Sequence, residues 1–398
     1  MDGLNTELFF ALIRAGLWED TMAHDSRFTV SDFEQVDWNE VCRLAEEQSS
    51  VGVVLAGIDW FKVHDTQFTV PQEVLFQWIG EVQMLEQQNI AMNQFIGRLV
   101  GKMRDADIYT LLVKGQGIAQ CYERPLWRCC GDVDLFLNNV NYNKTKKLLV
   151  PIASEVEREY IREQHLGMTI DNWVVELHGA LRCGLSRRID KTLDEIQNNI
   201  FCGGSVRFWM NGSTQVFLPG ENEDAVFVFT HILRHLYEGG IGIRQICDWC
   251  RLLWTYRDSL DCGLLESRIR KMGLMSEWRA FGAFAVEYLG MPSEAMPFLD
   301  VRSHKEDGRC LIDKRLRLKA ERIKGFIMMS GNFGHNRGSW LMEHDSWFTR
   351  LYVVRKAFSM GRRIGDLISH ARIFPLDSLR FFPYIMFNGV RSAMRGEG

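Results

Sequence analysis

The chain has 398 residues, of which 46% are hydrophobic and 25% charged, and its formal net charge is −4. These proportions are typical of a globular protein with room for two or three domains. A net charge this small excludes an overall basic surface of the kind used for general nucleic-acid binding, and ten cysteines at irregular spacing do not make a disulfide framework. Reduced thiols, a short N-terminal apolar run and no apolar stretch of membrane-spanning length predict a cytoplasmic protein.

Residues 1–104 are predicted to form a helical segment. Apolar side chains near the start recur at helical spacing, as Leu8, Leu12 and Leu17 illustrate. A long helix is expected to begin after Thr69, because Thr69-x-x-Gln72 resembles a capping box, and to continue to Met103.

Residues 105–182 are predicted to form a small α/β unit, since compact apolar runs replace the helical spacing. The tight turn Asp171-Asn172 is expected to join two of its strands into a hairpin. The expected strands are Ile108–Val113, Val133–Leu137, Met168–Ile170 and Trp173–His178, and the expected helices are Gln116–Tyr122 and Asn143–Ala153.

Residues 183–398 are predicted to be mainly helical, with one β-hairpin near residues 206–218. Asn211-Gly212 favours a primed turn there, and Pro219 ends the hairpin. Apolar residues around Trp249 and Trp278 mark two later helical faces. The expected fold class is therefore α+β, with a small mixed sheet between N- and C-terminal helical segments.

Two aspartates in the second predicted strand suggest a metal site. Residues two apart in a strand point to the same face, so Asp132 and Asp134 are expected to project side by side. Adjacent carboxylates repel each other, and a divalent cation between them relieves that repulsion. Glu176 alternates with Val175 and Leu177 and is the natural third acid, although the same alternation fits a solvent-facing residue.

Lys114 and Gly115 follow the first predicted strand directly. Backbone N–H groups and the helix dipole at such a turn favour phosphate, and Lys114 adds a positive charge. Neither a P-loop motif nor a dinucleotide-binding glycine motif is present. The Lys-Gly pair therefore indicates a phosphate site only in combination with the Asp-x-Asp strand that follows it.

Taken in order, KGQG, RCCGDVDL and VELH resemble the nucleotidyltransferase superfamily, and more narrowly an uncharacterised bacterial nucleotidyltransferase-like family. The segment from Thr230 to Trp249 and the sequence GNFG at 331–334 share in this resemblance. Gln116 stands where the superfamily usually has serine or glycine.

The resemblance implies transfer of a nucleoside monophosphate from an NTP, such as ATP, to a hydroxyl-type acceptor with release of pyrophosphate. It implies Mg²⁺ or Mn²⁺ as cofactor. The acids that it assigns to metal binding and catalysis are Asp132, Asp134 and Glu176. The nucleotide- and phosphate-binding residues that it implies are Lys114, Gly115, Gln116, Arg128, Gly131 and Arg244.

Two pairs of polar residues four apart have open roles. His231 and His235 share a helix face and suit either a packed interior or a metal, but no third ligand is evident. Arg244 and Asp248 form either a simple ion pair within a helix or a phosphate contact held in place by the aspartate.

Two other functions compete with the enzyme. A catalytically inactive scaffold would keep the fold, and its three acids would not converge. An RNA-modifying transferase would need a basic channel leading to the aspartates, which the near-neutral charge does not favour.

Overall fold

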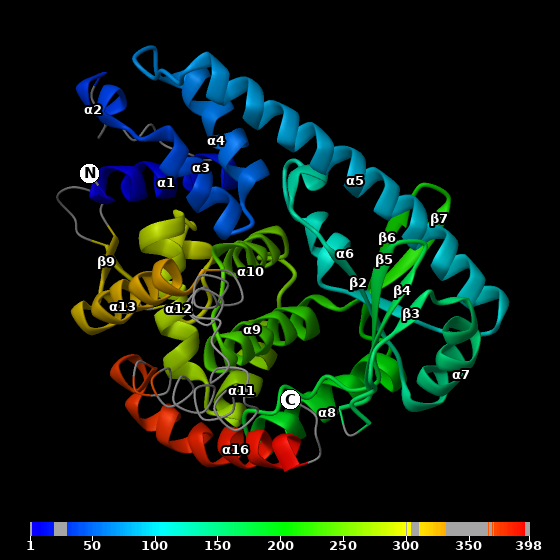
Figure 1. Ribbon diagram of the computed structural model, residues 1–398. Helices are drawn as coiled ribbons and strands as arrows, with labels where there is room; N and C mark the ends of the chain where they lie inside the picture. Colours follow the sequence, from blue (N-terminus) through cyan, green and yellow to red (C-terminus); the bar gives the residue numbers. More distant parts are fainter. Residues whose placement is uncertain are drawn as a thin grey trace, which may run out of the picture.

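The computed structural model describes residues 2–19, 30–161, 163–299, 301–303, 310–331 and 370–394, with Gly365 and Ile368. The protein is α+β, as predicted: one mixed sheet stands beside a large helical region (Figure 1). The helices that precede the sheet are α1 (Asp2–Leu17), α2 (Val30–Gln35), α3 (Trp38–Glu47), α4 (Val51–His64) and α5 (Gln72–Asp105).

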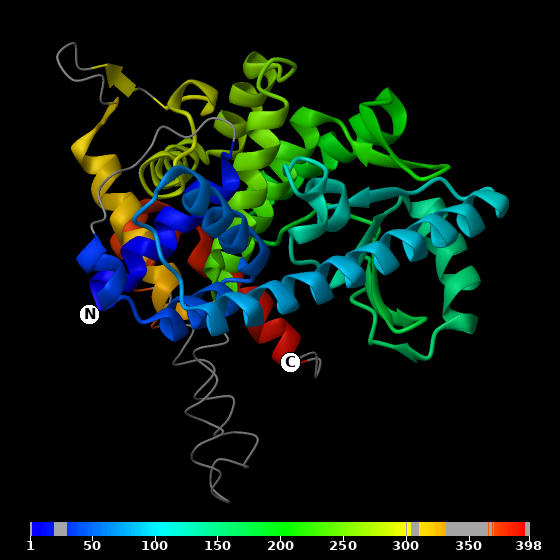
Figure 2. The same cartoon turned by 90° about the horizontal axis from the view of Figure 1, so that it is seen from above.

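The helix α5 joins the two parts of the molecule. It runs from the helical region along the sheet, as Figures 1 and 2 both show. Its residues Phe95 and Leu99 share a buried apolar cluster with Leu135 and Val175 of the sheet. Those strand residues alternate with Asp134 and Glu176, so the apolar face of the strands is packed in the core and the acids project from the other face.

The predicted start of α5 at a Thr69 capping box is wrong. The helix begins at Gln72, and Pro71 is its N-cap without a side-chain capping bond. Proline disfavours helical backbone at the residue before it, so Val70 cannot belong to the first turn.

The sheet has the strand order β1-β2-β5-β4-β3. Only β2 and β5 are parallel, and the other neighbours are antiparallel. The hairpin predicted at Asp171-Asn172 is present, and both turn residues have positive φ. The elements of this part are β1 (Leu111–Val113), α6 (Gly115–Ala119), the 3-10 helix η1 (Pro125–Trp127), β2 (Asp132–Phe136), α7 (Asn139–Leu149), the 3-10 helix η2 (Val150–Ile152), β3 (Glu155–Val156), β4 (His165–Ile170) and β5 (Trp173–His178).

Two helices of this part start earlier than predicted. The helix α6 begins at Gly115 rather than Gln116, and α7 begins at Asn139 rather than Asn143. Asn138 explains the second difference, because its side chain accepts the backbone N–H of Asn141 and caps the helix.

The second half of the chain supplies the hairpin and most of the helical region. An aromatic contact joins α10 (Ile243–Thr255) to α12 (Met275–Leu289), where the rings of Trp249 and Trp278 meet edge to face with centroids 4.7 Å apart. The elements are α8 (Arg187–Gly203), β6 (Val206–Asn211), β7 (Thr214–Pro219), α9 (Glu221–Glu238), α10 (Ile243–Thr255), α11 (Cys262–Met272), α12 (Met275–Leu289), the 3-10 helix η3 (Ser293–Ala295), β8 (Val301–Ser303), β9 (Cys310–Ile312), α13 (Lys314–Ser330) and α16 (Pro375–Met394).

The hairpin β6–β7 packs into the core beneath the sheet. Val216 and Leu218 share that buried cluster with Met92 of α5. The division at 104/105 and 182/183 therefore stays a prediction, since the core of the α/β unit takes side chains from both flanking segments. Of the GNFG sequence, only Gly331 lies within the described residues. None of the helices described is long and apolar enough to cross a membrane.

Candidate functional site

Three carboxylates converge on the face of the β2–β5 pair opposite the apolar core. Asp134 lies directly opposite Glu176 in the parallel register, and Asp132 lies two residues before Asp134 on the same face. One carboxylate oxygen from each residue lies within 4.8 Å of the others. The structure thus brings together the three acids that the sequence predicted as metal ligands.

Asp134 is the most enclosed of these acids. Its side chain is 1% exposed, and its Oδ1 lies 2.7 Å from Lys114 Nζ and 2.7 Å from His178 Nε2. Lys114 reaches it from the end of β1, because β1 is antiparallel to β2 and places Val113 opposite Asp134. Lys114 has a φ of 56° and Gly115 a φ of 42°, so this turn holds a lysine in backbone that favours glycine.

The acids repel one another through their charges. The negative charge of Asp134, followed by burial, raises the pKa of Asp132, whereas the positive charge of Lys114 acts in the opposite direction. Burial lowers the pKa of Lys114, but the charges of Asp134, Asp132 and Glu176 outweigh burial and raise it. Lys114 is therefore a firmly charged ammonium that offsets part of the negative charge of the cluster.

Two histidines contact the third acid. Glu176 Oε2 lies 3.1 Å from His165 Nε2 and 3.4 Å from His178 Nε2. Burial raises the pKa of Glu176, yet these two contacts and the charge of Lys114 lower it overall. Burial lowers the pKa of His178, but its bonds to Asp134 and Glu176 raise it overall.

This donor set fits a hard divalent cation. Mg²⁺ and Mn²⁺ prefer oxygen ligands, and three carboxylates that face one another provide them. In a comparison with known proteins, the model of an uncharacterised nucleotidyltransferase family matches residues 34–290. The chain belongs to this family. No curated protein and no solved structure matches the chain.

Arg128, predicted to contact phosphate, is engaged elsewhere in this nucleotidyltransferase-family chain. Its Nε and Nη2 donate to Asp248 of α10, at 3.0 and 2.6 Å, and both side chains are buried. The Tyr122 hydroxyl donates to the same carboxylate at 2.8 Å. The ion pair therefore ties the loop before β2 to α10, and Arg128 Nη1 is its only nitrogen without a hydrogen-bond partner among the described residues.

Arg244 lies one helical turn before Asp248 in α10. Its Nη1 is 3.8 Å from Asp248 Oδ2, so the predicted pair within the helix is present. Its positive charge also acts to lower the pKa of Asp132 and of His235. A nucleotide-contacting role for Arg244 stays a prediction of the family resemblance.

Gln116 projects into the protein rather than toward the acids. Its side chain is 1% exposed, and Nε2 donates to Asn89 Oδ1 of α5 at 2.7 Å. Asn89 in turn donates to the carbonyls of Leu126 and Arg128. With its side chain held in this way, Gln116 retains only its backbone for the phosphate contact that the family resemblance implied.

The two glycines differ in what surrounds them. A Cβ on Gly115 would lie 3.3 Å from Cys130 Sγ, and the positive φ of this residue would strain any other amino acid. The space beside Gly131, just before Asp132, is open. Gly131 therefore leaves room for a ligand next to the acids.

His231 and His235 of α9 face each other, with Nε2 atoms 2.8 Å apart. Burial and then the charge of Lys114 lower the pKa of both, that of His235 to about 3. The pair is consequently neutral. Among the described residues, these histidines belong to no group of three metal-ligand atoms.

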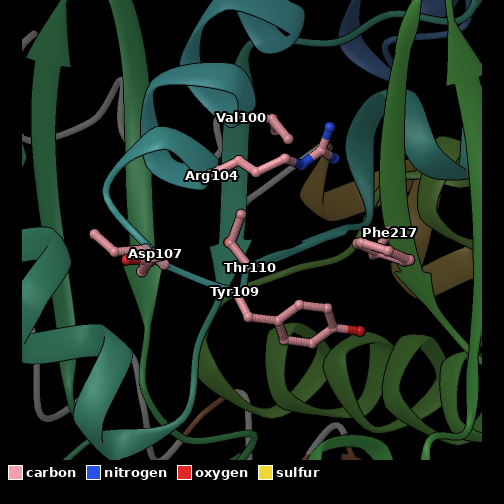
Figure 3. A pocket seen from close by; sticks show the side chains of 7 residues that line it. Val100, Arg104, Asp107, Tyr109, Thr110 and Phe217 are labelled. Atoms are coloured by element: carbon pink, nitrogen blue, oxygen red, sulfur yellow. The ribbon is translucent and has the colours of Figure 1, made fainter.

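A separate cavity of about 270 Å³ lies between the end of α5 and β7 (Figure 3). Tyr109 and Thr110, which line it, precede β1, whereas Lys114 follows the other end of that strand. The cavity therefore does not belong to the carboxylate site.

His165 and His178 were not predicted as site residues from the sequence. His178 shares a strand face with Glu176, so its position two residues later was a usable signal. His165 has no such signal, because its position depends on the pairing of β4 with β5.

Proposed function

We propose that this protein transfers a nucleoside monophosphate from an NTP to a hydroxyl-type acceptor, either a small molecule or a protein, and releases pyrophosphate. The observation that carries this proposal is the convergence of Asp132, Asp134 and Glu176 within 4.8 Å. Membership of the nucleotidyltransferase family supports nucleotidyl transfer in general. The scaffold alternative expects acids that do not converge, and the geometry does not favour it.

The reaction exchanges one bond at the α-phosphorus for another. The acceptor oxygen forms a bond to the α-phosphorus, the bond to the bridging oxygen of the β-phosphate breaks, and the acceptor hydroxyl loses its proton. Asp132, Asp134 and Glu176 would hold Mg²⁺ or Mn²⁺, which supplies Lewis-acid stabilisation of the charged phosphates. In this proposal Glu176 would also assist the deprotonation of the acceptor.

Lys114 has two partners in this proposal. Without nucleotide it lies against Asp134, at 2.7 Å, and offsets the charge of the acids. A bound triphosphate offers more negative charge than one carboxylate, so Lys114 moves to the β- or γ-phosphate when the nucleotide and its cation arrive. Arg244 and the backbone of the Gly115 turn contact the remaining phosphate oxygens.

Calorimetry with ATP, GTP, CTP and UTP in the presence of Mg²⁺ tests the proposal. We expect the wild type to bind at least one NTP and the variant Asp132→Ala/Asp134→Ala to bind none measurably. If the wild type binds no NTP, or the double variant binds equally well, the enzymatic function is wrong. Incubation with α-phosphate-labelled NTPs and a cell extract then shows whether the label moves to protein, RNA or a small molecule.

Lys114→Met is expected to change the affinities for cation and nucleotide in opposite directions. Loss of the ammonium at 2.7 Å from Asp134 frees the carboxylates, so Mn²⁺ alone should bind roughly tenfold more tightly. Loss of a charge-assisted hydrogen bond to phosphate, about 1.5–3 kcal/mol, should weaken NTP binding roughly 10- to 100-fold. Calorimetric titrations with each ligand measure both changes.

The control for this prediction is Lys146→Met. Lys146 also forms an ion pair in the α/β unit, with Glu159 at 2.8 Å, but it does not contact the three acids. Both affinities should stay at their wild-type values. A decrease in Mn²⁺ affinity in Lys114→Met would contradict the role given to the lysine.

A further inference from the structure

A second group of potential metal ligands adjoins the three carboxylates. It consists of His165, Glu176 and His178, whose ligand atoms lie within 4.8 Å of one another. His165 lies opposite His178 in the antiparallel β4–β5 register, and Glu176 lies two residues before His178. All three side chains consequently project from one face of the sheet.

The separations between these atoms match those of ligands around one ion. With bonds of about 2.1 Å to zinc, adjacent ligand atoms lie about 3.0 Å apart in octahedral and about 3.4 Å apart in tetrahedral geometry. The observed separations from Glu176 Oε2 are 3.1 Å to His165 Nε2 and 3.4 Å to His178 Nε2. The ligand atoms of the two histidines lie within 4.8 Å of each other, so a movement of these side chains would bring all three ligands to one ion.

The ligand types distinguish this group from the carboxylate group. Imidazole nitrogen binds zinc and neighbouring transition metals well, whereas Mg²⁺ prefers oxygen. The side chains of His165, Glu176 and His178 are 26%, 28% and 16% exposed, so water or a substrate oxygen can complete the coordination. Three protein ligands and an open position are the arrangement found in catalytic zinc sites.

A further acid, Glu157, lies beside this face, next to the glycine that pairs with Glu176. Gly167 pairs with Glu176, and a Cβ on Gly167 would overlap the carboxylate of Glu157. The missing side chain thus allows the Glu157 carboxylate to lie against the strand. Its negative charge favours a cation nearby.

We propose that His165, Glu176 and His178 form a binding site for a divalent transition-metal ion of the zinc type, distinct from the oxygen site of Asp132 and Asp134 and sharing Glu176 with it. This inference goes beyond the proposed reaction, because it concerns an ion that binds in the absence of nucleotide. The shared carboxylate has two oxygens and can serve both groups. His178 gives up its hydrogen bond to Asp134 when the ion binds.

Titration of the full, metal-free chain with Zn²⁺ alone tests the site, and Co²⁺ serves as a spectroscopic probe. We expect the wild type to bind one Zn²⁺ in the presence of excess Mg²⁺, and Co²⁺ to give visible absorption that Zn²⁺ abolishes. His165→Ala should weaken Zn²⁺ binding by at least about 100-fold, since even the loss of a group that orients a ligand costs 10–100-fold. His165→Gln, which keeps a polar side chain, should show the same loss if the alanine variant is unstable.

Two control variants separate this site from its surroundings. His64→Gln changes a histidine of α4 that stacks on Trp60, and it should leave Zn²⁺ binding unchanged. Asp132→Asn removes an oxygen ligand without touching the histidines, so it should retain Zn²⁺ binding and lose binding of Mg²⁺ with nucleotide. Because Asp132→Asn is expected to affect nucleotide binding and not Zn²⁺ binding, it distinguishes a failure of the proposed function from a failure of the zinc site.

Absence of Zn²⁺ binding in the wild type, or unchanged binding in both His165 variants, would overturn the proposal. The two histidines would then act only as hydrogen-bond partners of Glu176 and Asp134.

Discussion

Replacement of Asp134 by asparagine is expected to lower the rate of nucleotidyl transfer by at least about 10³-fold, equivalent to about 4 kcal/mol of transition-state stabilisation. Asparagine keeps the shape of the side chain but removes the charge that holds the cation. Asp134 is 1% exposed at the centre of the site, and both Lys114 and His178 contact its Oδ1 at 2.7 Å. Transfer of label from an α-phosphate-labelled NTP, relative to wild type, measures the effect.

The matched control for this prediction is Asp194→Asn. Asp194 forms a surface ion pair with Arg182, at 2.8 Å, and does not contact the acids. We expect it to retain wild-type activity. The thermal unfolding midpoint of Asp134→Asn should stay near that of wild type, because the loss of its ion pair is offset by less repulsion with Asp132. A folded Asp134→Asn variant with more than a tenth of wild-type activity would contradict its role as a metal ligand.

Local patterns in the sequence predicted the pair Asp132 and Asp134, and they left Glu176 either as the third acid or as a solvent-facing residue. Asp132 and Asp134 are two residues apart in a strand, and Glu176 alternates with apolar neighbours, so the face of each strand was readable. The family resemblance then implied that Glu176, on a later strand, belongs to the same site as the two aspartates. The exact register, Asp134 opposite Glu176, arises from a parallel pairing between segments distant in the chain. No local pattern encodes such a pairing.

The side chains of Gln116 and Arg128 depend on partners that are distant in the sequence. The family resemblance implied that both residues contact phosphate. In the structure, the side chain of Gln116 donates to Asn89, and that of Arg128 donates to Asp248 of α10. A long polar side chain can turn to either side of its backbone. The partner that decides its direction comes from another part of the chain.

Asp248→Ala is expected to lower the free energy of unfolding by about 3–5 kcal/mol, because it leaves the guanidinium of Arg128 buried without its counter-charge. In the wild type, burial lowers the pKa of Arg128, and the charge of Asp248 outweighs burial and raises it. An arginine side chain stays protonated in proteins, so in the variant Arg128 does not lose its proton to relieve the loss of Asp248. Urea unfolding followed by circular dichroism measures the change. Tyr122→Phe removes only the hydroxyl that donates to Asp248, and it should cost about 1 kcal/mol.

Asp258→Ala is the matched control. The side chain of Asp258 is 90% exposed, and its Oδ2 lies 3.7 Å from Arg257 Nη2. The substitution should leave the free energy of unfolding unchanged. If Asp248→Ala proved as stable as this control, the buried pair would not stabilise the junction between the loop before β2 and α10.

The same ion pair is expected to affect nucleotide binding. Arg128 is tied to Asp248 and lies four residues before Asp132, so its loosening should also lower nucleotide affinity, whereas Asp258→Ala should leave that affinity unchanged. A stability loss without an affinity loss would show that the ion pair holds the fold but does not position the acids.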